Sequence, residues 1–232
     1  MKLLTLITGI LLGTIILASC QQNIGKVELE NELDSASYSI GVSIGSNIMK
    51  SPMQEMNYDA MMRGLMEVME GEETEIDEHQ ANQIVTGYMQ KIEMQVAQEN
   101  LQAGRNFLAE NGKRDGVVTT ESGLQYLVIQ EGTGPKPTLA DQVKVHYHGT
   151  LLDGTVFDSS LENEPVTFGV GRVIKGWQEA LQLMPVGSKY KIWVPGELGY
   201  GLRPMPGGKI KPNDLLIFEV ELFDIIKAEN NQ

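Results

Sequence analysis

Cysteine is almost absent from this chain of 232 residues, since the only one is Cys20. A disulfide within the chain is therefore excluded. Basic residues are also scarce, because 18 Lys and Arg stand against 31 Asp and Glu, which gives a formal net charge of −13. Proteins that bind nucleic acid need a basic surface to neutralise phosphates, so the sequence predicts no nucleic-acid partner.

Proline is nearly missing from the first part of the chain. Only Pro52 precedes residue 130, whereas the other eight of the nine prolines follow it. Both tryptophans, Trp177 and Trp193, also lie in the later part, while nine of the twelve methionines lie in residues 49–94. This change in composition predicts two domains of different class.

One long apolar run stands at the start of the chain. Met1-Lys2 is followed by a nearly uninterrupted apolar run over 3–17 and then by Ala18-Ser19-Cys20. A charged start, an apolar stretch and small residues indicate a signal peptide, here residues 1–19, and the run is short for a spanning helix. Leu-Ala-Ser-Cys resembles the bacterial lipobox, which implies cleavage before Cys20 and its lipidation. The alternative is an uncleaved anchor helix, and either interpretation predicts an exported protein attached to a membrane of the bacterial cell envelope.

A polar tether at residues 20–33, beginning with the lipidated cysteine, precedes a helical domain at residues 34–112. Asp34, Asn57 and Asp77 are each placed to cap a helix. Polar side chains at these positions satisfy backbone N–H groups that a helix leaves free at its start. Three helices are therefore expected.

The third of these helices determines the expected assembly. Extended over 78–110, it is about 50 Å long at 1.5 Å per residue. Two short helices of the same chain cannot cover its apolar stripe, so we expect a homodimer through the N-terminal helices. The alternative is a helix broken near Gly104, which needs less cover.

From residue 113 to 232 the hydrophobic period changes to two. The segments 125–130, 143–152, 189–194 and 215–223 are predicted to be strands. One short amphipathic helix is expected at about 176–184. The fold class is therefore α+β, with an all-α N-terminal domain and a C-terminal antiparallel sheet wrapped around one short helix.

Five segments of the second domain occur in a recognisable order. They are Val-His-Tyr-His-Gly, Gly-Thr-Val-Phe-Asp-Ser-Ser, Val-Ile-Lys-Gly-Trp, Pro-Gly-Glu-Leu-Gly-Tyr-Gly and Leu-Ile-Phe-Glu-Val-Glu-Leu, at 145–149, 154–160, 173–177, 195–201 and 216–222. These segments resemble the FKBP family of peptidyl-prolyl cis–trans isomerases over residues 117–226. The helical part, with Ser-Tyr-Ser-Ile-Gly at 37–41, is similar to the Mip/FkpA branch, whose members are periplasmic or membrane-attached dimers.

The resemblance implies a pocket for a proline ring. It implies Trp177 as the floor, Tyr200 as the hydroxyl that bonds a substrate carbonyl, and Asp158 as the acid that bonds Tyr147. The walls that it implies are Tyr147, Phe157, Val173, Ile174 and Phe218, with Val166, Phe168 and Ile210 at the rim. Val166 stands where many relatives carry Phe. The structural alternative is that these aromatics only fill a small barrel, although polar tips are costly in a core without a use.

The implied reaction is rotation about X–Pro bonds in unfolded or nascent polypeptides. It needs no general base, nucleophile or cofactor, and the sequence has no signature for one. His146 and His148 share a strand face, but no third ligand is apparent, so no metal site is expected. Two other functions remain open at this point: a holdase chaperone that uses the methionine-rich helices, and a surface lipoprotein with no role in folding.

Overall fold

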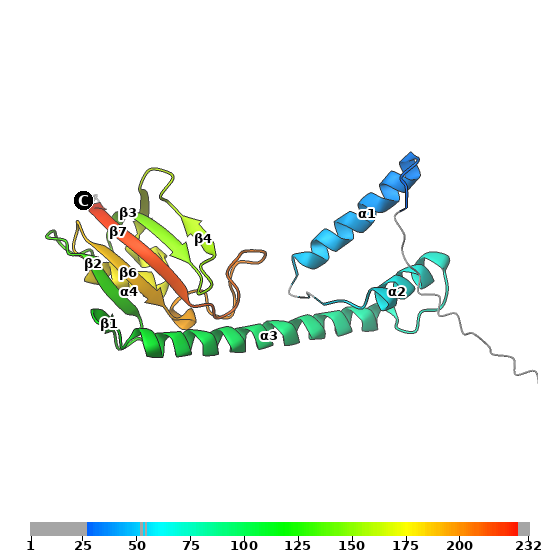
Figure 1. Cartoon of the computed structure of the whole chain (residues 1–232), viewed down its shortest axis with the longest axis horizontal. Helices are drawn as coiled ribbons and strands as arrows, with labels where there is room; N and C mark the ends of the chain where they lie inside the picture. Colours follow the sequence, from blue (N-terminus) through cyan, green and yellow to red (C-terminus); the bar gives the residue numbers. More distant parts are fainter. Residues whose placement is uncertain (1–26, 52, 54, 227–232) are drawn as a thin grey trace, which may run out of the picture. The chain divides into compact units, whose positions relative to one another are not determined.

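The computed structural model of the chain describes residues 27–51, 53 and 55–226 (Figure 1). The predicted signal peptide and the lipidation site at Cys20 lie outside these residues. The chain divides into two units, one that ends at Ser46 and one that begins at Asn47. Among the described residues, no helix has both the length and the apolar character needed to cross a membrane.

The first unit contains most of helix α1, Glu32–Met49. Its start differs from the prediction, because Asn31 Oδ1 accepts a hydrogen bond from the Asp34 N–H at 3.0 Å. Asn31 therefore caps the helix, and the Asp34 carboxylate accepts from the Glu30 N–H instead. No residue of α1 is buried.

Helices α2, Tyr58–Glu70, and α3, Glu78–Asn111, begin the second unit. Asn57 caps α2 through its side chain, and Gly71 ends it in a left-handed conformation with φ 72°. Asp77 caps α3 in a capping box. These two caps were predicted from the sequence and are confirmed.

Helix α3 continues without a break through Gly104. Gly104 is buried, and a Cβ added there would lie 3.4 Å from Leu215 Cβ. The missing side chain lets the helix approach the following domain closely, so this glycine marks a contact and not a break. The expected single long helix of 34 residues is therefore present.

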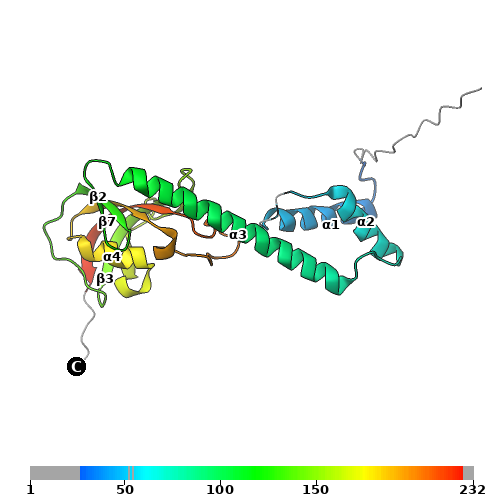
Figure 2. The ribbon, with the colours of Figure 1, turned by 90° about the horizontal axis from the view of Figure 1, so that it is seen from below.

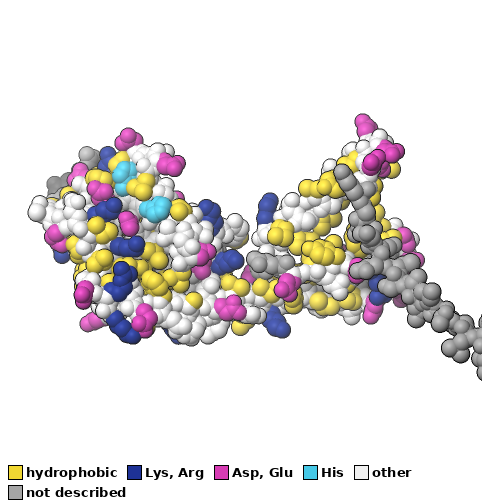
Figure 3. Space-filling view, viewed as in Figure 1, with side chains coloured by type: hydrophobic (Ala, Val, Ile, Leu, Met, Phe, Trp, Pro, Cys, Tyr) yellow, Lys and Arg dark blue, Asp and Glu magenta, His cyan; other side chains and the backbone are white. Residues whose placement is uncertain are grey.

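Apolar side chains remain at the surface of the helical part (Figure 3). Met69 on α2 and Met94 on α3 are 78% and 74% exposed, and Ile84 and Tyr88 on α3 are about half exposed. The two helices therefore leave several large apolar side chains exposed to solvent.

A seven-stranded antiparallel sheet forms the rest of the second unit. The strand order is β1-β2-β6-β7-β3-β4, and β5 pairs with the other end of the β3 edge. The strands are β1 Val117–Thr119, β2 Gln125–Gln130, β3 Gln142–Thr150, β4 Val156–Ser159, β5 Val166–Gly169, β6 Lys189–Val194 and β7 Leu216–Ile226.

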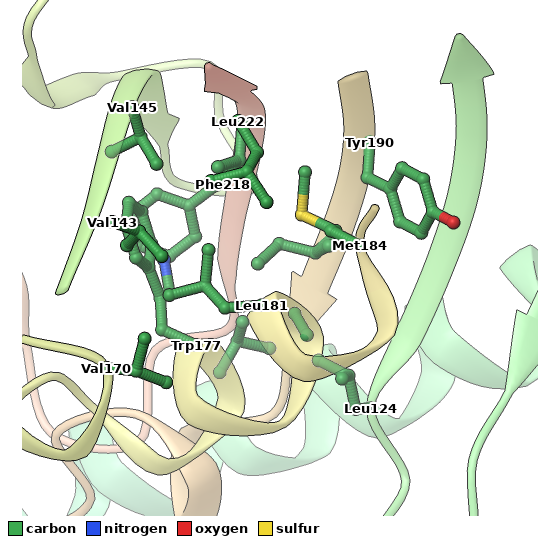
Figure 4. Close-up of a cluster of buried hydrophobic side chains, with 14 of the residues drawn as sticks. Leu124, Val143, Val145, Val170, Trp177, Leu181, Met184, Tyr190, Phe218 and Leu222 are labelled. Atoms are coloured by element: carbon green, nitrogen blue, oxygen red, sulfur yellow. The ribbon is translucent and has the colours of Figure 1, made fainter. Parts of the chain in front are cut away.

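Helix α4, Lys175–Leu183, packs on one face of this sheet and forms the core with it. Trp177 and Leu181 of α4 point toward Val143 and Phe218 of the strands (Figure 4). Short 3₁₀ turns, η1 Val170–Arg172 and η2 Gly196–Leu198, follow β5 and β6. This is the predicted sheet around one short helix.

The C-terminal half of α3 packs on the opposite face of the sheet (Figure 2). Trp193 is 1% exposed although its neighbours Ile192 and Val194 belong to the core on the α4 side. Successive side chains of a strand point to opposite faces, so Trp193 lies on the α3 side. Gln125, its partner in β2, donates to the Leu108 carbonyl at 2.9 Å. The long helix and the sheet domain are therefore joined by buried contacts.

Candidate functional site

Five aromatic rings from five elements meet at one end of the core. Trp177 makes edge contacts with Tyr147, Phe168 and Phe218 at centroid distances of 5.4, 5.8 and 5.2 Å. Phe157 in turn meets Phe218 edge-on at 5.4 Å. Edge-to-face geometry is the favoured arrangement of aromatic rings. We call these five residues the aromatic cluster.

The aromatic cluster runs from a buried base to a more exposed edge. Trp177 and Phe218 are 4% and 5% exposed, whereas Tyr147, Phe157 and Phe168 are only partly buried. The indole is buried because Trp177 lies in the first turn of α4, on the side of the helix that faces the sheet. The cluster therefore has a buried base at Trp177 and Phe218 and a partly exposed edge formed by the other three rings.

Gly149 allows the two phenylalanines of the cluster to approach the β3 backbone. A Cβ added to it would lie 2.7 Å from Phe157 Cζ and 3.0 Å from Phe218 Cε1. Real Cβ atoms do not approach other atoms this closely, so only glycine fits here. A glycine inside a strand is the sequence signal for such an approach, although its role was not predicted.

Tyr147 and Asp158 form the polar edge of the cluster. The Tyr147 hydroxyl donates to Asp158 Oδ2 at 2.7 Å, as the family resemblance implies. Burial, followed by the bond to Asp158 and the charge of that carboxylate, raises the pKa of Tyr147 well above its usual value, and the nearby Tyr200 adds to this rise. Tyr147 therefore stays protonated at physiological pH and remains a hydrogen-bond donor.

Ser160 fixes the backbone that carries Tyr147. Its buried hydroxyl accepts from the Tyr147 N–H at 2.8 Å, and its own N–H donates to the Tyr147 carbonyl at 3.0 Å. Ser160 was part of a quoted motif, but its buried bonding role was not predicted. Its hydroxyl also bonds His146 Nδ1.

The remaining predicted residues differ in their burial and in their neighbours. Val173, Ile174 and Ile210 are partly buried and pack against the core. Val166 pairs with Val145 at the start of β5 and is also partly buried. Tyr200, which follows η2, is 44% exposed and lies near enough to Tyr147 to affect its pKa.

The chemistry available here is apolar contact and hydrogen bonding. The buried Nε1 of Trp177 has no hydrogen-bond partner among the described residues. Those residues also hold no group of His, Cys, Asp and Glu suited to a metal ion. His146 and His148 bond Ser160 and Ser159 instead. The cluster therefore offers apolar ring surfaces with hydrogen-bonding groups at their edge.

Two family models match the chain. One, described as FKBP-type peptidyl-prolyl cis-trans isomerase, matches residues 134–223. The other, described as the domain amino terminal to FKBP-type peptidyl-prolyl isomerase, matches residues 33–128. Together they span the described helices and nearly all of the sheet domain.

Curated proteins and solved structures give the same result. The chain is 39% identical to "Outer membrane protein MIP" of Legionella longbeachae, over 98% of this chain and 99% of that protein. It is 42% identical to the "FKBP-type 22 kDa peptidyl-prolyl cis-trans isomerase" of Escherichia coli strain K12, over 82% of this chain and 94% of that protein. The crystal structure of FkpA from Escherichia coli matches with a TM-score of 0.66 and 30% identity, over 87% of this chain and all of that one.

Proposed function

We propose that this chain, which belongs to the family of FKBP-type peptidyl-prolyl cis–trans isomerases, holds the proline ring of its substrate in the aromatic cluster above Trp177. The chain is an isomerase of X–Pro bonds that acts in protein folding, and the comparisons do not favour a holdase chaperone or a surface lipoprotein without a role in folding. The observation that carries the site is the edge contact of three rings on Trp177, beside the Tyr147–Asp158 bond.

An apolar cluster is suited to the barrier of this reaction. Rotation about an X–Pro bond is opposed by about 20 kcal/mol, because it breaks the resonance of the amide. The half-rotated amide has lost its charge separation and is less polar than the planar one. A dry apolar site therefore disfavours the planar ground state more than the transition state, and this difference lowers the barrier.

The polar groups at the edge of the cluster orient the peptide. Tyr200 is 44% exposed and acts on the pKa of Tyr147, and in this proposal its hydroxyl donates to a substrate carbonyl next to the proline. Asp158 holds the Tyr147 ring in place through its 2.7 Å bond. Val173, Ile174, Val166 and Ile210 complete the apolar surroundings. No step requires proton transfer.

Tyr200→Phe tests the assignment of the orienting hydroxyl. The purified protein is expected to accelerate cis–trans exchange of a prolyl tetrapeptide, measured by NMR exchange or by protease-coupled cleavage. Loss of one hydrogen bond to substrate is expected to lower kcat/KM about three- to tenfold. A wild-type protein that gives no acceleration would contradict the proposed function, whereas a fully active Tyr200→Phe would remove only the role of Tyr200.

The helical part is proposed to join two copies of the chain. Apolar side chains are exposed on α2 and α3, including Met69, Ile84, Tyr88 and Met94. A second copy offers the same surface in return, so a two-fold contact buries both. Each catalytic domain would then act on a proline-containing segment of an unfolded or nascent polypeptide.

The Legionella relative is named an outer membrane protein, and we place this chain in the bacterial cell envelope, anchored through lipid on Cys20. Acyl chains contribute about 0.8 kcal/mol per buried CH₂, and several of them hold a protein firmly on a membrane. Cys20→Ser, expressed in a bacterium that processes lipoproteins, is expected to move the protein from the detergent phase to the aqueous phase on phase partition. Gln22→Ser serves as the control and stays with the wild type in the detergent phase. Wild-type protein in the aqueous phase would exclude the anchor.

A further inference from the structure

Two asparagines join helix α3 to the segment that follows the Tyr200 loop. Asn100 Nδ2 donates to the Pro212 carbonyl at 2.9 Å. The second bond runs from this segment back to the helix, since Asn213 Nδ2 donates to the Ala97 carbonyl at 3.2 Å. Each asparagine thus bonds the backbone of the other's segment, and both residues are partly buried. We call this pair of bonds the asparagine clamp.

The asparagine clamp lies at the base of the loop that carries Tyr200. The Asn213 N–H donates to the Gly201 carbonyl at 2.8 Å, which closes the loop from residue 201 to residue 213. Asn213 itself has φ 59°, the only positive φ of a non-glycine residue among those described. Asparagine tolerates this conformation better than most residues, because its short side chain bonds nearby backbone. The side chain of Asn213 therefore bonds α3, while its backbone N–H bonds Gly201, the residue next to Tyr200.

Other contacts fix the same loop from both sides. Gly196 packs so tightly that an added Cβ would lie 2.7 Å from the Asn213 carbonyl oxygen. The Gly201 N–H donates to the Gly196 carbonyl at 2.9 Å. At the far side, Lys209 Nζ donates to the Val156 carbonyl at 2.7 Å, next to Phe157. The loop that follows Tyr200 is thus fixed at its base near α3 and by a bond to β4.

Few side chains of the loop bury apolar surface. Leu202 and Met205 are 68% and 77% exposed, and Ile210, near the end of the loop, is the apolar side chain that packs against the core. A segment with few buried contacts depends on its end points for its conformation. The salt bridge between Arg105 on α3 and Glu197 is exposed on both partners and contributes little. The clamp is therefore the main directional contact between α3 and this loop.

We propose that Asn100 and Asn213 are positioning residues for the isomerase, through which helix α3 holds Tyr200 in its substrate-binding position. This inference rests on the proposed function, because Tyr200 is its target. When the clamp opens, the loop samples other conformations, and substrate binds only the fraction of molecules in which Tyr200 is in place. The long helix is then part of the active site and not only a spacer between domains.

The test uses the whole chain and separates the effect of the Asn213 backbone conformation from the effect of its side-chain bond. Asn213→Gly keeps the positive φ at no steric cost and removes only the bond to Ala97. Asn100→Asp keeps the shape but sets an acceptor against the Pro212 carbonyl. For each variant, KM for a prolyl tetrapeptide is expected to rise about three- to tenfold while kcat changes less than twofold. Asn106→Asp is the matched control, since Asn106 is exposed on α3 and accepts from Gln102, a bond that aspartate preserves.

A Tyr200→Phe background decides whether the clamp acts through Tyr200. If it does, Asn213→Gly causes no further rise in KM once the hydroxyl is gone, so the two effects are not additive. A rise by the same factor in both backgrounds would overturn the inference. So would a variant whose melting temperature falls while its KM stays at the value of Asn106→Asp. An inactive wild type would refute the proposed function itself. The results of the clamp variants, measured in an active protein, bear only on the role of the clamp.

Discussion

Gly149→Ala is expected to lower kcat/KM for a prolyl peptide at least about tenfold, a loss of about 1.4 kcal/mol in transition-state stabilisation. The added Cβ would stand 2.7 Å from the Phe157 ring and 3.0 Å from the Phe218 ring. Phe218 is buried in the core, so moving it away would disrupt core contacts. Phe157 is only partly buried, so it is expected to swing outward and open the wall of the aromatic cluster. The measurement is NMR exchange on a prolyl tetrapeptide.

Gly169→Ala provides the matched control for this change. Gly169 lies in β5, which pairs with the same strand β3, and its added Cβ would meet only the Arg172 side chain, whose Cδ is nearest at 3.4 Å. This variant is expected to keep wild-type activity. Overpacking at Gly149 is expected to cost about 1–3 kcal/mol of stability, readable from urea unfolding. Full activity in Gly149→Ala would show that the Phe157 wall takes no part in catalysis.

Local sequence signals predicted most of the fold because they act over a few residues. Asn57 and Asp77 cap their helices as polar side chains at such positions do, and β2 and β6 have the predicted bounds. The helix at 175–183 was placed within one residue. Each of these elements is long enough for its hydrophobic period to be read.

The strands that were missed are short. β1 has three residues, and β4 and β5 have four each. Two alternating positions do not distinguish a strand from a loop, so these strands follow only from pairing with β2 and β3. The cap at Asp34 was wrong for a related reason, because Asn31 stands three residues earlier and is an equally good acceptor.

The candidate site was predicted through its side chains and not through its supports. The residues in quoted motifs, such as Trp177 and Phe218, do come together. Gly149 matters because it has no Cβ, which would collide with Phe157 and Phe218. Asn213 matters because its side chain bonds helix α3, more than 100 positions earlier in the chain. Neither effect has a local pattern, because both depend on which distant backbone lies opposite. Tertiary contact is therefore what the sequence pattern leaves undetermined here.

Ile84→Glu together with Tyr88→Glu is expected to convert a dimer into a monomer, which halves the mass measured by light scattering. Both side chains are about half exposed on α3 and lie one turn apart, so they share one face of the helix. Two carboxylates on each copy would have to lose their water at a two-fold contact, and burying an unpaired charge is costly. The substituted faces of α3 from two copies are therefore not expected to pair.

Gln90→Glu adds one carboxylate on another face of α3 and is expected to leave the mass unchanged. Gln90 is exposed, and at about 100° per residue it lies roughly opposite Tyr88 on the helix. Activity per chain toward a short prolyl peptide is expected to stay the same in all variants, because the aromatic cluster lies in the sheet domain. A wild type of monomer mass would refute the proposed assembly. If the monomer isomerises short peptides normally but refolds a proline-limited protein more slowly, the paired helices serve to present two active sites to one chain.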